Sequence, residues 1–490
     1  MSSFEPLLGA AALLLAIALF ASIGRKSLAI WIFYGLLLAL LLGDSIQQAH
    51  WQLVPLYLIA LLIPWIARKA SRARLIVAGA LTMLLAACFV TLSFLLPMFR
   101  LPEPTGPYLV GTRILHMVDL HRPDSGGRMA SGRRELMVQA WYPVDKDQTC
   151  DHLAPYRRRA ETTMLSSYMA VLKTQSCSNT RISRSEESYP IILFNPAWKG
   201  QRTQSTYLMQ ELASHGFVVI SIDHTYLSGP VAFPDGTVIR SADVQDIDDF
   251  QGRSPAAELQ QGNDEVMLEA ADDSFVLDEL TTRKASGFDP WYQGLRLNRV
   301  GAAGHSFGGA VAYQVAFSDR RVVSALNMDG WTFGDPVRFG FRTPTMQMYE
   351  DVSRPSDAEL RTAPDDEKLY WNFDRTLERN VTCSLHRIGG YQLMLKGSRH
   401  MNFADRSLYS PMRKWTDSGV ANPRQLHRII SAYTLAFFEE TLLDKRELLL
   451  TQSSSPFPEA VFTRYVSSDS AIADAEKCTD NASQISQIHR

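Results

Sequence analysis

One short stretch of the sequence has the residue types and spacing of a catalytic nucleophile. Residues 304–308 read Gly-His-Ser-Phe-Gly, which fits the pattern G-x-S-x-G with Ser306 at its centre. Small residues around a serine allow the sharp strand-to-helix turn that exposes its hydroxyl. The apolar run Val300–Ala303 precedes the motif, and the small residues of Gly309–Ala312 follow it. This context favours a catalytic serine over a passive one in a glycine-rich turn.

A serine hydroxyl is a poor nucleophile without a base, and a histidine should follow it in the chain. His400 follows the strand-like run Gln392–Leu395 and a turn, which is where a base is expected. His386 lies in an alternating run that predicts a strand, and His427 lies in a predicted helix as a surface or packing residue. His400 is therefore the predicted base.

The acid that orients the histidine should end an earlier strand. Asp329 directly follows the apolar run Val322–Met328 and is the predicted acid. Asp335 is the rival, but it precedes Pro336 in a loop, where a turn or capping role is simpler. An oxyanion formed at the serine would need two backbone N–H donors. We expect one from Phe307, directly after the nucleophile, and one from the loop 195–200.

The elements that must position these residues read as an α/β-hydrolase fold, a mostly parallel sheet with helices on both faces. Short apolar runs typical of buried strands alternate with stretches of helical spacing. The predicted strands are Arg134–Tyr142, Pro190–Phe194, Phe217–Ile222 and Arg299–Ala303, and the predicted helices are Thr206–His215, Asp264–Arg283 and Arg424–Leu443. The stretch Ser241–Asn263 is polar and predicts a surface excursion.

Four apolar runs without internal charge precede this domain and predict four transmembrane helices. The runs are Leu7–Ile23, Leu28–Gly43, Leu53–Ile66 and Leu75–Met98. A signal peptide is disfavoured for the first run because Met1–Pro6 has no basic residue. The predicted organisation is residues 1–99 as the transmembrane region, 100–107 as a proline-rich linker, 108–450 as the catalytic domain and 451–490 as a flexible polar tail.

Charge between the apolar runs predicts the orientation in a membrane. The first and third connections are basic, and the second has no Lys or Arg; the basic residues are Arg25, Lys26, Arg68, Lys69, Arg72 and Arg74. The positive-inside rule then places the domain outside the cytoplasm. We expect an integral protein of a bacterial inner membrane, with its catalytic domain on the periplasmic or extracellular side.

Composition narrows the class of partner and the redox setting. The 490 residues carry a formal net charge of −2, which gives no reason to expect nucleic acid. Four cysteines lie beyond the apolar runs, and they allow three disulfide pairings or four free thiols. Proximity in the sequence suggests Cys150–Cys177 and Cys383–Cys478. No cysteine spacing resembles a zinc site, so no metal or cofactor is expected.

The catalytic region resembles the plasma-type platelet-activating-factor acetylhydrolases, a lipase-like branch of the α/β-hydrolases. The matching stretches run from Gly106 to about Leu443 and are Gly106–Tyr108 with Val110–Gly111, Arg134–Tyr142, Leu212–Phe217, Gly304–Gly309, Asp329 with Trp331, and Gly397–Asp405. The four apolar runs are not part of the resemblance.

This resemblance implies calcium-independent release of short or oxidised acyl groups from phospholipids or small esters, as by a 1-alkyl-2-acetylglycerophosphocholine esterase. It assigns Ser306, Asp329 and His400 to the triad and points to the Trp198 N–H as the second oxyanion donor. The chain departs from the family's His-Gly at Pro196-Ala197. Four apolar residues could line an acyl pocket or equally fill the core: Trp331, Phe333, Met346 and Met348.

Two other functions remain open from the sequence. The first is the same chemistry on non-phospholipid esters, as in cutinase-like enzymes and dienelactone hydrolases. The second is a non-catalytic membrane protein whose hydrolase domain senses or binds a partner. Reaction of Ser306 with a fluorophosphonate probe would separate the second from both enzymatic functions.

Overall fold

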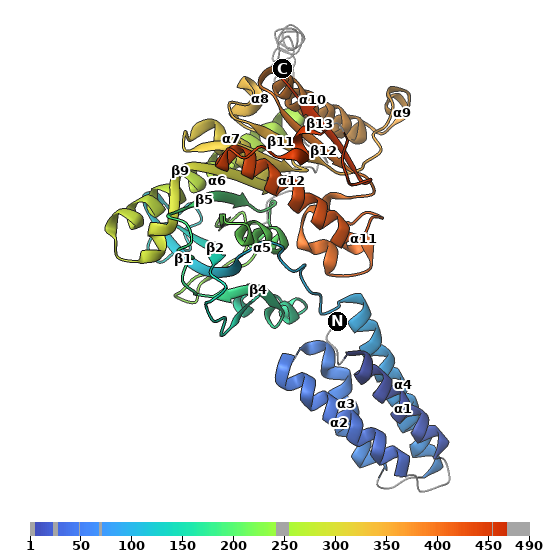
Figure 1. The fold of residues 1–490 in the computed structure, drawn as a ribbon. Coiled ribbons are helices and arrows are strands. Elements are labelled where there is room, and N and C mark those ends of the chain that lie inside the picture. Colours follow the sequence, from blue (N-terminus) through green and yellow to red (C-terminus); the bar gives the residue numbers. More distant parts are fainter. Residues whose placement is uncertain are drawn as a thin grey trace. The chain divides into compact units, whose positions relative to one another are not determined.

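The chain folds as two compact units (Figure 1). The computed structural model describes residues 5–22, 28–48, 50–67, 71–241, 254–452 and 454–467. Unit 1 consists of Met1–Leu101, Pro155–Thr174 and Arg406–Thr416, and unit 2 consists of Pro102–Ala154, Gln175–Asp405 and Asp417–Arg490. Two segments of the predicted catalytic domain therefore fold with the apolar N-terminal region.

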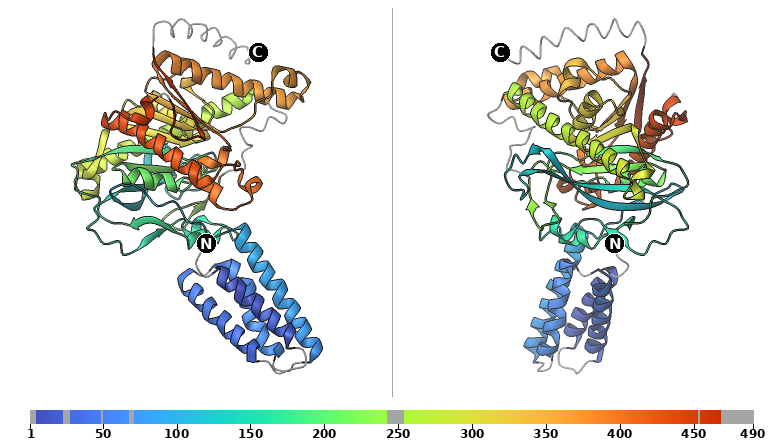
Figure 2. Two further views of the ribbon diagram at one scale, coloured as in Figure 1. Left: turned by 45° about the vertical axis from the view of Figure 1, so that its right-hand side comes forward. Right: turned by 90° about the vertical axis from the view of Figure 1, so that its left-hand side faces the viewer.

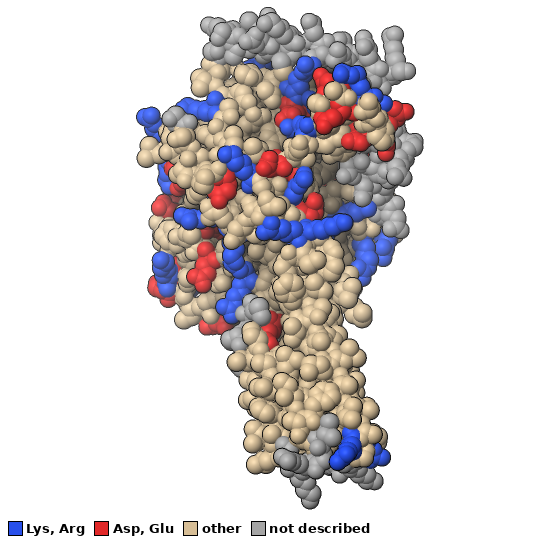
Figure 3. All heavy atoms as spheres, turned by 90° about the vertical axis from the view of Figure 1, so that its right-hand side faces the viewer, with Lys and Arg blue, Asp and Glu red and all other residues tan. Residues whose placement is uncertain are grey.

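Unit 1 contains four apolar helices, one for each predicted run: α1 (Glu5–Ala21), α2 (Leu28–Gln48), α3 (Val54–Ala67) and α4 (Arg72–Leu95). Many of their large apolar side chains face outward, including Leu61 and Trp65, which are 72% and 81% exposed. The face of this unit seen in Figure 3 is largely without charge between its ends. By length and composition, two windows suffice to cross a membrane, Leu28–Ser45 and Arg72–Leu95, whereas α1 and α3 are shorter.

The expectation of helices without internal charge is wrong at one end of unit 1. Helix α1 begins at Glu5 and α2 continues through Asp44, so both carboxylates lie inside helices, and both are buried. His50 lies 3.6 Å from Asp44 and hydrogen-bonds Gln52, whose amide donates to the Leu96 carbonyl. The apolar runs therefore omit the first residues of α1 and the last residues of α2, which carry these carboxylates. The basic residues Arg25, Lys26, Arg68 and Lys69 lie outside the described residues.

The two inserted segments join unit 1 through specific contacts. The Trp51 indole donates to the Leu165 carbonyl at 3.1 Å. The Phe99 ring lies 5.1 Å from the ring of Tyr409 and 5.2 Å from that of Tyr156, and the two tyrosine hydroxyls are 2.6 Å apart. These aromatic contacts explain why the residues just after α4 pack with segments far along the chain.

Unit 2 is built on an eleven-stranded sheet of order β13-β12-β11-β10-β9-β5-β6-β2-β1-β4-β3. The strands from β12 to β6 in this order are parallel. Strand β2 runs antiparallel to both β6 and β1, β13 runs antiparallel to β12, and β1 pairs with β4 in parallel. The strands are β1 (Leu109–Pro123), β2 (Arg133–Val144), β3 (Leu153–Pro155), β4 (Lys173–Ser178), β5 (Tyr189–Asn195), β6 (Val218–Asp223), β9 (Leu295–His305), β10 (Val322–Met328), β11 (Thr345–Tyr349), β12 (Gly390–Leu395) and β13 (Ala460–Tyr465). A separate hairpin pairs β7 (Val231–Ala232) with β8 (Val238–Ile239).

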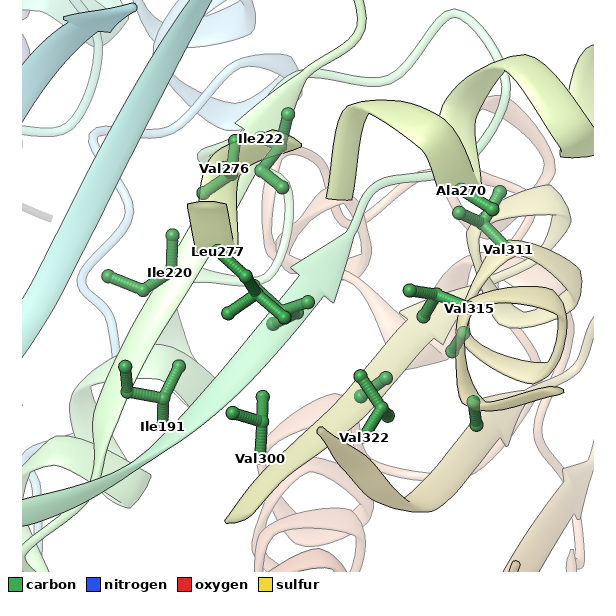
Figure 4. Packing of buried hydrophobic residues seen from close by; sticks show 14 of the residues in the cluster. Ile191, Ile220, Ile222, Ala270, Val276, Leu277, Val300, Val311, Val315 and Val322 are labelled. Atoms are coloured by element: carbon green, nitrogen blue, oxygen red, sulfur yellow. The ribbon is translucent and has the colours of Figure 1, made fainter. Parts of the chain in front are cut away.

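Helices cover both faces of the sheet (Figure 2). On β9, a Cβ added at Gly301 would meet Phe438 of α12 (Pro423–Leu443). The adjacent Val300 and Ala302 instead join the apolar cluster with α6 (Pro255–Ser286) and α7 (Phe307–Ser318). Because neighbouring strand residues point to opposite faces, α12 covers one face and α6 with α7 the other. Figure 4 shows this core, with Val311 and Leu277 among the packed side chains.

The remaining helices are mostly short. They are α5 (Thr206–Ser214), α8 (Asp335–Phe339), α9 (Asp357–Thr362), α10 (Asp365–Ile388), α11 (Arg413–Thr416) and α13 (Leu448–Thr451), with 3₁₀ turns η1 (Trp51–Leu53), η2 (Arg159–Glu161), η3 (Ser167–Ala170), η4 (Pro290–Gly294), η5 (His400–Phe403) and η6 (Asp405–Leu408). The fold agrees with the predicted α/β-hydrolase architecture, and the predicted strands and helices of the catalytic region are present with shifted ends.

Three local predictions differ from the structure. His386 lies in helix α10, not in a strand, because the short alternating stretch around it is the end of a 24-residue helix. The predicted tail contributes β13, which pairs with β12 at the sheet edge. In the predicted linker, Thr105 and Gly106 donate to Glu211 and Ser214 of α5, so this part is docked on unit 2. Residues 242–253 of the predicted excursion and 468–490 of the tail lie outside the described residues.

The structure contains the predicted disulfide between Cys150 and Cys177 in unit 2. The other suggested pair, Cys383–Cys478, stays a prediction because Cys478 lies outside the described residues. Cys88 is a free and exposed thiol on α4.

Candidate active site

Ser306 lies at the turn between β9 and α7, with an unusual backbone conformation. Its φ is +56° and its ψ is −127°, outside the regions that residues with a side chain normally adopt. The Ser306 N–H donates to the Met328 carbonyl at the end of β10, at 2.8 Å. The turn therefore holds the serine at the carboxyl edge of the sheet, beside the end of the neighbouring strand.

Glycines make this turn possible because other backbone segments occupy the space of their missing side chains. A Cβ at Gly304 would lie 2.0 Å from the Gly308 carbonyl oxygen, and one at Gly308 would lie 2.1 Å from the Asn195 carbonyl oxygen. A Cβ at Gly330 would lie 1.9 Å from the Ser306 carbonyl oxygen. Any larger residue would push apart the ends of β5, β9 and β10, so the motif glycines are required by close packing.

The predicted acid and base are in contact. Asp329 directly follows β10, and its Oδ2 lies 2.7 Å from Nδ1 of His400 in η5. The other carboxylate oxygen accepts the Glu350 N–H at 2.8 Å, and the Asp329 N–H donates to Met348. With its N–H and both carboxylate oxygens engaged, the carboxylate is fixed. It therefore holds Nδ1 of the imidazole in the protonated form and directs Nε2 elsewhere.

His305 connects the nucleophile turn to the loop of the base. Its ring centre lies 4.6 Å from that of His400, and its Nε2 lies 2.9 Å from the His400 carbonyl oxygen. Its Nδ1 lies 2.6 Å from the amide nitrogen of Gln204, so Nδ1 accepts and Nε2 donates. Burial, together with the neighbouring His400, keeps the pKa of His305 well below its usual value. The neutral imidazole of His305 thus links the turn of Ser306 to the backbone of His400.

A second carboxylate, Glu350, lies beside the Asp329–His400 pair. It follows β11, and its carboxylate lies 4.0 Å from the Arg399 guanidinium. Burial and the nearby Asp329 charge raise the pKa of Glu350 to about 7. Burial opposes the charged form of His400, but its bond to Asp329 and the surrounding carboxylates outweigh this and raise its pKa.

The loop after β5 carries Trp198, which is the second expected oxyanion donor after Phe307. The Gly200 N–H donates to the Ala197 carbonyl at 2.6 Å, which closes a four-residue turn with Trp198 second and Lys199 third. Lys199 has φ +55°, as the third residue of a type II turn requires. Among the described residues, the backbone N–H groups of Trp198 and Phe307 have no protein acceptor.

The four predicted pocket residues have different surroundings. Phe333, Met346 and Met348 are buried in the core, with exposures of 1% or less. Trp331 is partly exposed, and its indole donates to Asp374 of α10 at 2.9 Å. Phe333 connects it to the site, since the Phe333 ring lies 5.7 Å from that of Phe307. Trp331 is therefore the one residue of these four that solvent reaches.

The residues that were alternatives to Asp329 and His400 make packing or hydrogen-bond contacts elsewhere. The carboxylate of Asp335, at the start of α8, accepts the Gln314 amide at 3.1 Å. His427 is buried in α12 and stacks on Tyr207 with ring centres 3.8 Å apart. His386 faces Tyr465 of β13. The roles of His305, Gln204 and Glu350 could not be predicted from the sequence. His305 occupies a variable position of the G-x-S-x-G motif, and Gln204 and Glu350 stand in no recognisable chemical pattern.

Comparisons with known proteins agree with this arrangement. A family model described as platelet-activating factor acetylhydrolase, isoform II, matches residues 97–234. A protein of Arthroderma benhamiae named "Probable 1-alkyl-2-acetylglycerophosphocholine esterase" is 24% identical over 74% of this chain and 94% of its own length. The platelet-activating factor acetylhydrolase of Bos taurus is 25% identical over 45% of this chain and 55% of its own.

A solved structure shares most of the fold. The ferulic acid esterase from Streptomyces cinnamoneus matches with a TM-score of 0.56 and 26% identity, over 74% of this chain and 99% of its own. These proteins are all named as esterases or acetylhydrolases. The expected enzyme class, a hydrolase of carboxylic esters in the α/β-hydrolase superfamily, is thereby confirmed.

The raised pKa of His400 predicts how Asp329 contributes to stability at different pH. A pair that raises a histidine pKa stabilises the folded chain fully below the ordinary value of 6.5 and loses this effect as pH rises through the folded value. We expect Asp329→Asn to lower the melting temperature of the detergent-solubilised chain more at about pH 5.5 than at about pH 9.

Asp335→Asn is the matched control, since this carboxylate bonds an amide that does not titrate. Its effect should be similar at the two pH values. An equally large loss for Asp329→Asn at both would contradict the charge-pair explanation.

Proposed function

We propose that this chain is a serine ester hydrolase with Ser306 as nucleophile, Asp329 as acid and His400 as base. The observation that carries the proposal is the 2.7 Å Asp329–His400 bond at the sheet edge where the strained turn holds Ser306. The order of acid and base along the chain and the engaged carboxylate both support this assignment.

The proposed reaction follows from these contacts. Nε2 of His400 takes the proton as the Ser306 hydroxyl attacks the ester carbonyl, and Asp329 stabilises the resulting imidazolium. The N–H groups of Phe307 and Trp198 donate to the oxyanion. Collapse releases the alcohol, which receives the proton from His400. Water then attacks the acyl-enzyme with His400 as base again, releasing the acid and restoring the serine.

We further propose membership of the platelet-activating-factor acetylhydrolase family and anchoring in a membrane by the helices of unit 1. The matched residues 97–234 and the Arthroderma benhamiae relative support the family and a phospholipid or small acyl ester as substrate. The outward apolar side chains of the four helices support anchoring, since lipid is the solvent that suits them. The basic loops favour a domain outside the cytoplasm.

The triad assignment predicts the effect of removing the nucleophile. Ser306→Ala should lower kcat for p-nitrophenyl acetate by about 10⁴-fold or more, because the triad acts as a unit. Labelling of the folded chain by a fluorophosphonate probe should disappear with the same substitution. Turnover that survives at the parental rate in Ser306→Ala would rule out this mechanism.

The oxyanion assignment can be tested at Trp198 without removing the turn. Proline is favoured at the second position of a type II turn, so Trp198→Pro keeps the turn but removes the N–H. We expect kcat to fall by about 10²- to 10³-fold, the usual effect of losing one oxyanion donor. Trp198→Ala is the control, since it loses the indole and keeps the N–H. Equal losses in the two variants would assign the effect to the indole instead.

A second candidate is an esterase of non-phospholipid esters, and one observation favours it. The ferulic acid esterase from Streptomyces cinnamoneus matches along nearly its whole length at 26% identity. The chemistry at Ser306 would be the same, and only the acyl group and the alcohol would differ.

An ester panel separates the two candidates. If phospholipids are the substrates, we expect kcat/KM to be highest for short-chain phosphatidylcholines and to fall as the acyl chain lengthens. Higher kcat/KM for methyl ferulate or p-nitrophenyl esters than for any phospholipid would favour the second candidate. Ser306→Ala provides the blank for each substrate.

A further inference from the structure

The loop that carries Trp198 begins at a fully buried amide. Asn195 ends β5, and its side chain is 0% exposed. Its Nδ2 donates to Asp273 of α6 at 2.8 Å, and its Oδ1 lies 3.0 Å from Nε2 of His224. The Asn195 carbonyl oxygen also lies against Gly308, directly after Phe307. Asn195 therefore contacts the turn that carries Ser306 and helix α6, and it begins the loop 195–200 that carries Trp198, called the oxyanion loop below.

His224 is the other centre of this network. It follows β6, and its Nδ1 lies 3.0 Å from Oδ2 of Asp272. Because Nε2 faces the Asn195 oxygen and Nδ1 faces a carboxylate, both ring nitrogens must donate, which requires the imidazolium. Burial opposes this charge, but Glu269 and Asp272 outweigh it and raise the pKa of His224 to about 9.

The charges around His224 are compensated inside the protein. Asp272 forms a bidentate pair with Arg134 and a 2.8 Å contact with Arg122. Glu269 lies 3.5 Å from His224. Burial raises the pKa of Glu269 to about 8 and that of Asp273 to about 7, so these two carboxyls are protonated more easily than usual.

Hydrogen bonds carry the position of His224 to the turn at Trp198. The loop after β6 begins at His224, whose carbonyl accepts the N–H groups of Leu227 and Ser228. The Leu227 carbonyl accepts the Lys199 N–H at 2.9 Å, and the Gly229 N–H donates to Gly200 at 2.8 Å. The turn is thus held by the loop that starts at His224, and the chain enters it from Asn195, whose side chain is bonded to the same histidine.

We propose that Asn195 and His224 are positioning residues for ester hydrolysis: together they hold the Trp198 N–H where the oxyanion forms. This inference rests on the proposed function. The side-chain hydrogen bonds of Asn195 and His224 run to each other and to α6, whereas the Asp329 carboxylate bonds His400 and the Glu350 N–H. We therefore expect a side-chain change at Asn195 or His224 to move the loop that carries Trp198 while the Asp329–His400 bond stays intact.

The experiment compares Asn195→Ala with Gln139→Ala in the full-length, detergent-solubilised chain. Gln139 is a matched control because it is also a buried amide of the sheet, on β2, and donates to Thr112 at 3.0 Å. We expect Asn195→Ala to lower kcat for p-nitrophenyl acetate by about 10- to 100-fold, with KM within about three-fold. Gln139→Ala should lower the melting temperature similarly and leave kcat near the parental value.

A double-mutant cycle tests whether the two residues act together. His224→Gln should lower kcat by a similar factor. The kcat of the double variant should be no lower than that of the less active single variant, because both residues act through one loop. Independent, multiplying effects would overturn the shared role. Should His224→Gln fail to fold, the comparison of Asn195→Ala with Gln139→Ala still decides.

The outcomes separate this inference from the proposed function. If Asn195→Ala loses no more kcat than Gln139→Ala while the parent turns over ester through Ser306, the positioning role is wrong and the hydrolase assignment stands. If the parent shows no Ser306-dependent turnover, the proposed function itself fails, and the positioning role fails with it.

Discussion

Close approach of three backbone segments around Ser306 is the constraint on which the site depends. The turn after β9 touches the end of β5 at Gly308 and the end of β10 at Gly330, with no room for a Cβ at either glycine. This contact brings Asp329, directly before Gly330, to the same edge as the serine. The strained φ of Ser306 persists because the surrounding strands fix both sides of the turn. A parallel sheet supplies that rigidity, since the carboxyl ends of its strands meet at one edge.

Polar side chains then connect the loops that leave this edge. His305 and Gln204 join the oxyanion loop to the backbone of His400 through bonds of 2.6 to 2.9 Å. Asn195 and His224 join the same loop to α6. Buried polar groups are costly unless they are satisfied, but satisfied networks hold one arrangement of a loop. These two sets of buried polar groups lie where they fix the loops at the carboxyl edge of the sheet.

The sequence predicts most of this fold because its strands are short apolar runs and because the glycines of its G-x-S-x-G motif indicate a tight strand-to-helix turn. Val322–Met328 matches β10 to the residue. The roles of Asn195 and His224 could not be predicted because a single polar residue at a strand end forms no sequence pattern. Only the order of the strands in the sheet brings these residues beside α6. Local alternation misassigned His386, whose environment is set by the whole of α10. Strand β13 was missed because an edge strand with one exposed face carries little apolar signal.

The motif around the base shows how a short resemblance can mark positioning as well as chemistry. In Gly397–Asp405, the side-chain oxygen of Asn402 accepts the N–H groups of Arg399 and Gly419, which closes the loop on itself. Asp405 accepts the first N–H groups of α5, a capping contact worth about 0.5–2 kcal/mol. Only His400 reaches the acid. The side chains of Asn402 and Asp405 instead accept backbone N–H groups. The contact of Asp405 with α5 fixes the end of the motif, and this helps to hold His400 within 2.7 Å of Asp329.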